Sequence, residues 1–185
     1  DLADLTTGDV VVIVDQACSK AMANDKGTSS APTAVSVTLS DDQITSTVDA
    51  NLQWTVTVNT TGTAPQYQFA VGDSYLYVTK TNNGVRVGSG ERNTFTIVTG
   101  GDNNGYYLYN GVTSPEADDR YVGCYNQENW RCYTSINSNI KGNNIAFFKQ
   151  SGDTPPAPTA NYYVVGKFGG TDSWGPAPER KMTRN

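Results

Sequence analysis

Residues 120–134, Arg-Tyr-Val-Gly-Cys-Tyr-Asn-Gln-Glu-Asn-Trp-Arg-Cys-Tyr-Thr, decide the expected fold because they align with residues 74–89 when one position is left as a gap. Each copy contains an apolar run, a polar turn and a second apolar run, which predicts a β-hairpin. In the earlier copy the turn signal is Asn83-Gly84, since these residue types tolerate the positive φ angles of a type I′ turn at least cost. The sequence therefore contains a repeated hairpin.

The hairpin register predicts which side chains face the core. With Asn83-Gly84 as the turn, Lys80 lies opposite Val87, and alternate residues of each strand share a face. One face is then apolar and the other carries aromatic residues and arginine. The predicted core face holds Leu76, Val78, Val85 and Val87, and the predicted outward face holds Tyr75, Tyr77 and Arg86 with Tyr121, Tyr125, Arg131 and Tyr133 in the later copy.

A third copy of the hairpin is predicted near the amino end. Val35-Ser36-Val37 matches the second strand of the other hairpins, although its connecting loop at residues 25–33 is longer. Four kinds of strand then recur three times. The strands that precede the hairpins are predicted at residues 10–15, 67–71 and 106–109, and strands with a large aromatic residue at 53–56, 94–97 and 145–148.

A threefold repeat of about 40 to 50 residues, whose last strand lies beside its first, predicts a β-trefoil over residues 8–150. The core should then unite Trp54, Phe95 and Phe147 or Phe148 with the apolar hairpin residues, including Val122 and Trp130. A two-sheet β-sandwich is the alternative all-β architecture, because regular short strands also suit it. The repeat unit, Tyr75-Leu76-Tyr77 with Val85-Arg86-Val87 after Trp54-Thr55-Val56, resembles trefoil modules of the ricin-lectin and fascin type.

Two further resemblances concern the setting of the chain. Residues 82–88 and 130–140 resemble segments of modules from large secreted and surface proteins of Bacteroidota, and residues 161–185 resemble the first strands of a β-sandwich module in outer-membrane starch-binding proteins. Proline-rich residues 153–160 form a linker by composition. The expected organisation is therefore a trefoil domain at 1–152, a linker at 153–160 and a truncated second module at 161–185. These resemblances imply an extracellular or cell-surface location and neighbouring domains in a multimodular parent protein.

The composition excludes several classes of function. The net charge is −5, with basic residues scattered along the chain, so no nucleic-acid partner is expected. No apolar run is long enough to cross a bilayer, so membrane insertion is not expected. The absence of histidine removes the Ser-His-Asp and Cys-His arrangements and most zinc sites. We expect no metal and no cofactor.

The carboxylates raise the question of catalysis, and the cysteines raise the question of a disulfide. Asp41-Asp42, Glu116 with Asp118-Asp119, and Glu128 could serve a glycosidase, but they lie in turn-like sequence and are predicted to be solvated, so no catalytic residue is assigned. The three cysteines leave at least one thiol unpaired, which should be Cys18. Cys124 and Cys132 form either a disulfide across the third hairpin or two buried thiols.

The favoured function is a non-catalytic carbohydrate-binding module, because aromatic rings stack on sugar rings while Arg and Asn bond their hydroxyls. A protein-interaction or adhesion spacer and an enzyme fragment with carboxylate catalysis are the alternatives. The third hairpin is favoured as the binding site, since it has more aromatic residues than the second hairpin. Replacing Arg131 and Tyr133 by alanine should abolish glycan binding, whereas alanine at Arg86 is expected to leave most of it intact. The predicted glycan-binding residues are Arg131, Tyr133, Tyr125, Tyr121, Asn126 and Asn129.

Overall fold

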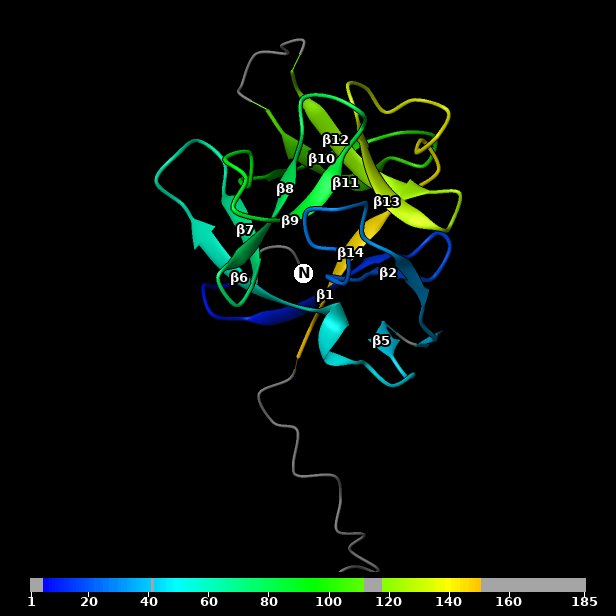
Figure 1. The fold of residues 1–185 in the computed structure, drawn as a ribbon. Coiled ribbons are helices and arrows are strands. Elements are labelled where there is room, and N and C mark those ends of the chain that lie inside the picture. Colours follow the sequence, from blue (N-terminus) through cyan, green and yellow to red (C-terminus); the bar gives the residue numbers. More distant parts are fainter. Residues whose placement is uncertain (1–4, 41, 112–117, 151–185) are drawn as a thin grey trace, which may run out of the picture. The chain divides into compact units, whose positions relative to one another are not determined.

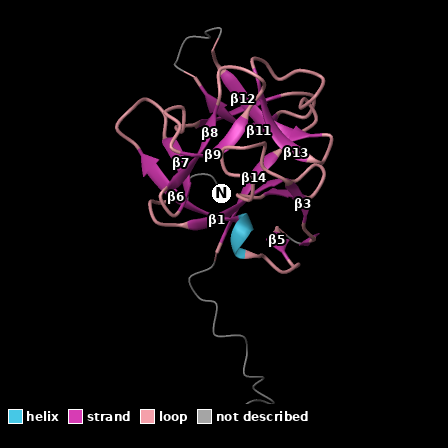
Figure 2. Ribbon diagram, viewed as in Figure 1, coloured by secondary structure: helices cyan, strands magenta, loops and turns pink. Residues whose placement is uncertain are grey.

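The computed structural model describes residues 5–40, 42–111 and 118–150, which form an all-β domain (Figure 1). The only helical element in this part of the chain is one turn of 3-10 helix, η2 at Ala50–Leu52 (Figure 2). None of the described residues forms a helix with the length and apolar character needed to span a bilayer. The strands are β1 (Val10–Asp15), β2 (Lys20–Met22), β3 (Ala34–Ser36), β4 (Leu39–Ser40), β5 (Gln43–Ile44), β6 (Gln53–Asn59), β7 (Gln66–Val71), β8 (Ser74–Val78), β9 (Val85–Gly88), β10 (Thr96–Gly100), β11 (Gly105–Asn110), β12 (Arg120–Tyr125), β13 (Asn129–Tyr133) and β14 (Ile145–Lys149).

Six of these strands close into a ring. β1 pairs antiparallel with both β6 and β14, β6 pairs with β7, and β10 pairs with β11. β7 meets the start of β10 through two backbone hydrogen bonds between Tyr67 and Phe95, at 2.7 and 2.9 Å. β11 lies beside β14 and completes the circuit. The predicted neighbours β1 and β14 are confirmed, with Val12 opposite Phe148.

The remaining paired strands form three hairpins, one in each repeat. They are β2–β3, β8–β9 and β12–β13, each inserted after a ring strand. A ring of six strands with three hairpins is the β-trefoil architecture that the repeat predicts. The β-sandwich alternative is therefore excluded.

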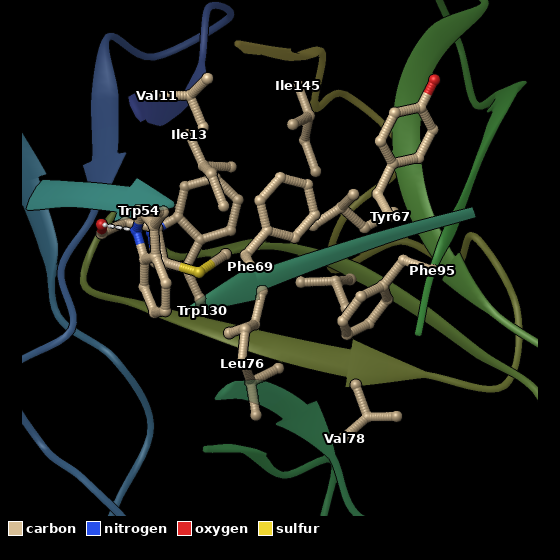
Figure 3. Close-up of a cluster of buried hydrophobic side chains, with 14 of the residues drawn as sticks. Val11, Ile13, Trp54, Tyr67, Phe69, Leu76, Val78, Phe95, Trp130 and Ile145 are labelled. Carbon is tan, nitrogen blue, oxygen red and sulfur yellow. Dashed lines mark hydrogen bonds between the residues drawn. The ribbon is translucent and has the colours of Figure 1, made fainter. Parts of the chain in front are cut away.

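The core forms where ring and hairpins meet, because alternate residues of each strand point inward (Figure 3). Trp54 and Trp130 are fully buried, as are Phe69 and Leu76, and Phe147 packs against the same cluster. The predicted convergence of the aromatic ring strands with the hairpin valines is confirmed, while Phe148 packs in a second cluster with Val12 and Leu52.

The register of the second hairpin differs from the sequence prediction by an even number of residues. In the second hairpin Leu76, not Lys80, lies opposite Val87, because Asn82 and Asn83 take the positive φ angles of the turn, at 60° and 49°. Gly84 is instead used for a contact with the third hairpin. Since the pleat alternates every two residues, an even shift preserves the inward faces, and these valines remain buried.

The predicted linker and second module, at residues 153–160 and 161–185, lie outside the described residues. Asp41 and Glu116, two of the candidate carboxylates, also lie outside them.

Candidate functional site at the junction of the three hairpins

Each hairpin is hydrogen-bonded to the other two at a common junction. The first and third hairpins are joined by Ala34 N–H to the Glu128 carbonyl and by Trp130 N–H to the Pro32 carbonyl, both at 2.9 Å. The second and third are joined by Cys132 N–H to the Asn83 carbonyl at 3.1 Å. Val87 N–H donates to the Gly27 carbonyl at 2.9 Å and joins the second to the first. The junction is thus fixed by backbone contacts.

A cavity of about 480 Å³ opens at this junction, with walls from all three hairpins. Most of its lining residues are polar, and they include Arg131 and Asn129, two of the residues predicted from sequence. The lining residues are Lys26, Ser29, Ser30, Ala31 and Thr33 from the first hairpin, Asn82, Asn83 and Arg86 from the second, and Glu128, Asn129 and Arg131 from the third.

The wall from the first hairpin exists because its connecting loop is longer than those of the other copies. Asp25 accepts hydrogen bonds from the backbone N–H and the hydroxyl of Thr33, at 3.1 and 2.6 Å. Lys26 ion-pairs with the same carboxylate at 3.1 Å. Burial raises the pKa of Asp25, but the hydrogen bonds from Thr33 and Lys26 outweigh it and the pKa lies below 3.8. Asp25 therefore stays ionised and holds the loop closed.

The guanidinium of Arg131 is held in place by two neighbours in its own hairpin. Its Nε–H donates to Asn129 Oδ1 at 2.8 Å. Its Cζ lies 4.2 Å from the centre of the Tyr125 ring, a cation–π arrangement. Tyr125 thus supports Arg131 beside the cavity, and it is not itself among the lining residues.

Arg86 lines the same cavity as Arg131, although it comes from another hairpin. The sequence alignment shows only that both occupy equivalent outward positions, and it led us to expect Arg86 to contribute little. The structure changes this expectation, because the two hairpins converge at Gly84 and Arg131, which form an isolated bridge. Lys26, Asn82, Asn83 and Glu128 are further lining residues that sequence reasoning missed; the excess length of the first loop was the available signal.

The predicted outward aromatic face is wrong for Tyr133, which is only 5% exposed. Its ring packs with Tyr107 and Ile140, and Ile136 packs against the same cluster. The connection that follows β13 folds back over this face and buries it. Burial also raises the pKa of Tyr133, although the nearby positive charge of Arg131 opposes the change.

The other two predicted residues lie away from the cavity lining. Tyr121 is half-buried, with its ring centre 4.8 Å from that of Tyr109. Asn126 is exposed in the turn of the third hairpin, where it adopts a φ of 50°. The structure therefore brings Arg131 and Asn129 into one site, with Tyr125 behind Arg131. Tyr121, Asn126 and Tyr133 are not lining residues, although the buried Tyr133 still contacts the Arg131 side chain.

Of the two predicted alternatives for Cys124 and Cys132, the structure has the second, in which both are buried free thiols. Cys124 lies opposite Trp130 and Cys132 opposite Val122, so the two cysteines are not directly paired, and all three cysteines are free. Donor atoms of Cys18, Cys124 and Asp15 lie within 4.8 Å of one another.

That cluster has the donor types of a metal site, but its groups already have structural partners. Asp15 accepts hydrogen bonds from the Asn144 backbone N–H at 2.9 Å and from Asn143 Nδ2 at 2.6 Å. The contact with Cys124, together with burial, raises the pKa of Cys18 above its usual 9.0. We therefore interpret the cluster as a polar tie between β1 and the segment that leads into β14.

The remaining candidate carboxylates are dispersed. Asp118 ion-pairs with Lys80 at 2.7 Å, and Asp119 accepts a hydrogen bond from the Tyr109 hydroxyl. Within the described part of the chain, Glu128 is the one carboxylate that lines the cavity.

Comparison with known proteins gives structural neighbours alone. No protein-family model matches the chain, and no curated protein does. A designed threefold-symmetric protein, ThreeFoil, aligns at 16% identity over 74% of this chain and 97% of its own, with a TM-score of 0.47.

A lectin from Polyporus squamosus, solved bound to the human-type influenza-binding epitope Neu5Aca2-6Galb1-4GlcNAc, aligns at 16% identity with a TM-score of 0.51. The alignment covers 79% of this chain and 50% of the lectin, so the chain spans about half the lectin's length. At this identity the likeness supports the β-trefoil fold and nothing beyond it.

Proposed function

We propose that this domain is a non-catalytic carbohydrate-binding module that holds a glycan in the cavity at the hairpin junction. The observation that carries the proposal is the lining of that cavity, where three hairpins contribute ten hydrogen-bonding side chains and one alanine. The volume of about 480 Å³ falls within the range of about 300–1,000 Å³ that is usual for ligand sites.

The chemistry of the lining suits hydroxyl-rich ligands. The amides of Asn82, Asn83 and Asn129 both donate and accept hydrogen bonds, and the hydroxyls of Ser29 and Ser30 do the same. Sugar hydroxyls need both kinds of partner. Because none of the described residues that line the cavity is aromatic, ring stacking contributes little there, and we expect affinities between micromolar and millimolar for a single site.

Binding without catalysis is favoured by the number of acids in the cavity. Glycoside hydrolysis by the usual routes requires two carboxyl groups that flank the scissile bond. Glu128 is the one acid among the lining residues that the structure describes. The β-trefoil lectin from Polyporus squamosus, with its bound glycan epitope, is a precedent for sugar binding on this fold.

We also propose that the domain belongs to a multimodular extracellular or cell-surface protein of the Bacteroidota type. The support is the sequence resemblance of residues 82–88, 130–140 and 161–185 to segments of such proteins. Protease accessibility of the parent protein on intact cells tests this placement, and complete protection would contradict it.

Affinity gel electrophoresis against soluble polysaccharides, with a glycan array to identify the ligand, tests the binding proposal. The parent protein should be retarded by its cognate glycan, and Arg131→Ala should lose most of the retardation. Tyr121→Phe should bind as the parent does, because Tyr121 does not line the cavity and the change removes only a hydroxyl.

Lys141→Ala is the matched control for loss of a positive charge. Lys141 is exposed, pairs with Asp102 at 2.9 Å and does not line the cavity. If Arg131→Ala and Lys141→Ala are retarded equally, the cavity is not the site. If the parent binds no glycan on the array or in the gels, the adhesion-spacer hypothesis replaces this proposal.

A further inference from the structure

The arginines of this domain fall into two groups according to their partners. Arg92 donates to Asn110 Oδ1 at 2.8 Å and to the Asp118 carbonyl, and Arg120 donates to the Lys80 carbonyl. These two side chains connect segments of the fold. Their guanidinium groups are used internally.

Arg86 and Arg131 have few internal partners. Arg86 donates from Nη1 to the carbonyl of its neighbour Val85 at 2.8 Å, and Arg131 donates from Nε to Asn129. Among the described residues neither arginine forms an ion pair. Each guanidinium has five N–H donors, so most of this capacity is not used by carboxylates of the chain.

The cavity is positively charged in a protein that is negatively charged overall. Three cations, one from each hairpin, line it: Lys26, Arg86 and Arg131. Glu128 is the one acid among the lining residues in the described part of the chain. Asp25 pairs with Lys26 at the edge of the loop. Counting both acids, this region carries a net charge of about +1, whereas the whole chain carries −5.

We propose that the ligand of this cavity is a sugar residue that carries a carboxylate, such as the uronic acid unit of a polysaccharide. This inference rests on the proposed carbohydrate-binding function and names the class of sugar. A carboxylate pairs with the flat fork of a guanidinium through two parallel hydrogen bonds, which a single hydroxyl cannot do. The neighbouring asparagine and serine side chains then bond the hydroxyls of the same sugar.

The net negative charge of the protein makes the binding of an acidic sugar sensitive to the cations of the cavity. Polyanions are repelled by a chain of net charge −5 unless a local positive site attracts them. Binding of an acidic polysaccharide must therefore depend on the junction cations and not on a general basic surface. This gives sharp expectations for substitutions.

The test uses alginate, polygalacturonate and hyaluronate, each beside a carboxyl-reduced form in which the uronate is converted to the neutral sugar. Affinity gel electrophoresis and calorimetry compare the parent with Arg86→Gln and Arg131→Gln, which retain hydrogen-bonding groups and lose charge. The parent should bind at least one uronate polymer about 10- to 100-fold more tightly than its reduced form, the effect of one charged hydrogen-bonded pair. Each glutamine variant should lose most of that preference, and Lys141→Gln should retain it.

The outcomes separate this inference from the proposed function. Equal binding of acidic and reduced polymers leaves carbohydrate binding standing and overturns the carboxylate assignment. Binding to dextran sulfate but to no uronate polymer also overturns it, in favour of a sulfated sugar. If the parent binds no polysaccharide in either form and no glycan on the array, both proposals fail.

Discussion

Replacing Trp54 by alanine should destabilise the domain more than any surface substitution, because this indole is fully buried where β6 meets β1. Its Nε1–H donates to the Met22 carbonyl at 3.1 Å, so the side chain contributes both apolar burial and a hydrogen bond (Figure 3). Removal of a buried tryptophan costs about 3 to 5 kcal/mol through lost burial and the cavity left behind. In a domain of this size that loss lowers the melting temperature by about 6 to 20 °C, at about 2 to 4 °C per kcal/mol.

Urea unfolding followed by far-UV circular dichroism measures the effect without relying on tryptophan fluorescence. Trp54→Phe is the matched control, since it retains most of the apolar volume and removes the N–H donor, and it should cost about 1 to 3 kcal/mol. If Trp54→Ala unfolds within about 1 kcal/mol of the parent, the indole does not anchor β6 to β2 and the described packing is wrong.

Two further predictions concern the carboxylate of Asp15 and the three free thiols. Burial raises the pKa of Asp15 above 3.8, so the folded state binds its proton more tightly than the unfolded state. The stability of the parent relative to Asp15→Asn should therefore fall as pH rises from about 3.8 through the raised pKa. Urea unfolding at pH 4 and 7 measures this difference, and the opposite trend would contradict the prediction. The three thiols should react slowly with Ellman's reagent in the folded protein at pH 8, because burial raises the pKa of Cys132 to about 11 and the pKa of Cys18 is also raised. All three should react after unfolding without reductant. Reaction of a single thiol in the unfolded protein would indicate a disulfide.

The sequence alone was sufficient to predict the fold because the same strand and hairpin pattern occurs three times. Any one hairpin signal is weak, but three copies at similar spacing require closure of the last strand against the first, and β14 does pair with β1. The exact registers could not be predicted. Asn82, Asn83 and Gly84 can each tolerate positive φ, and the choice among them depends on the contact of Gly84 with Arg131 in another hairpin.

The candidate site was predicted only in part, because it combines segments that are distant in the sequence. Arg131 and Asn129 were identified from their own hairpin, whereas Lys26 and Arg86 join them only through the junction of all three. The burial of Tyr133 depends on the segment after β13. Ile136 and Ile140, two apolar residues in an otherwise polar stretch, were the signal that this segment packs against the aromatic face.

The pairing of β1 with β14 also constrains when the domain can fold during translation. Val12 lies opposite Phe148, so β1 cannot pair with β14 until nearly the whole domain has left the ribosome. β7–β9 and β10–β13 can form ladders within their own stretches much earlier. Because contacts between distant residues carry a large loop-closure entropy, they form late and slow the overall rate. The nascent chain should therefore expose the edge of β1 that pairs with β14 until synthesis of the ring is complete.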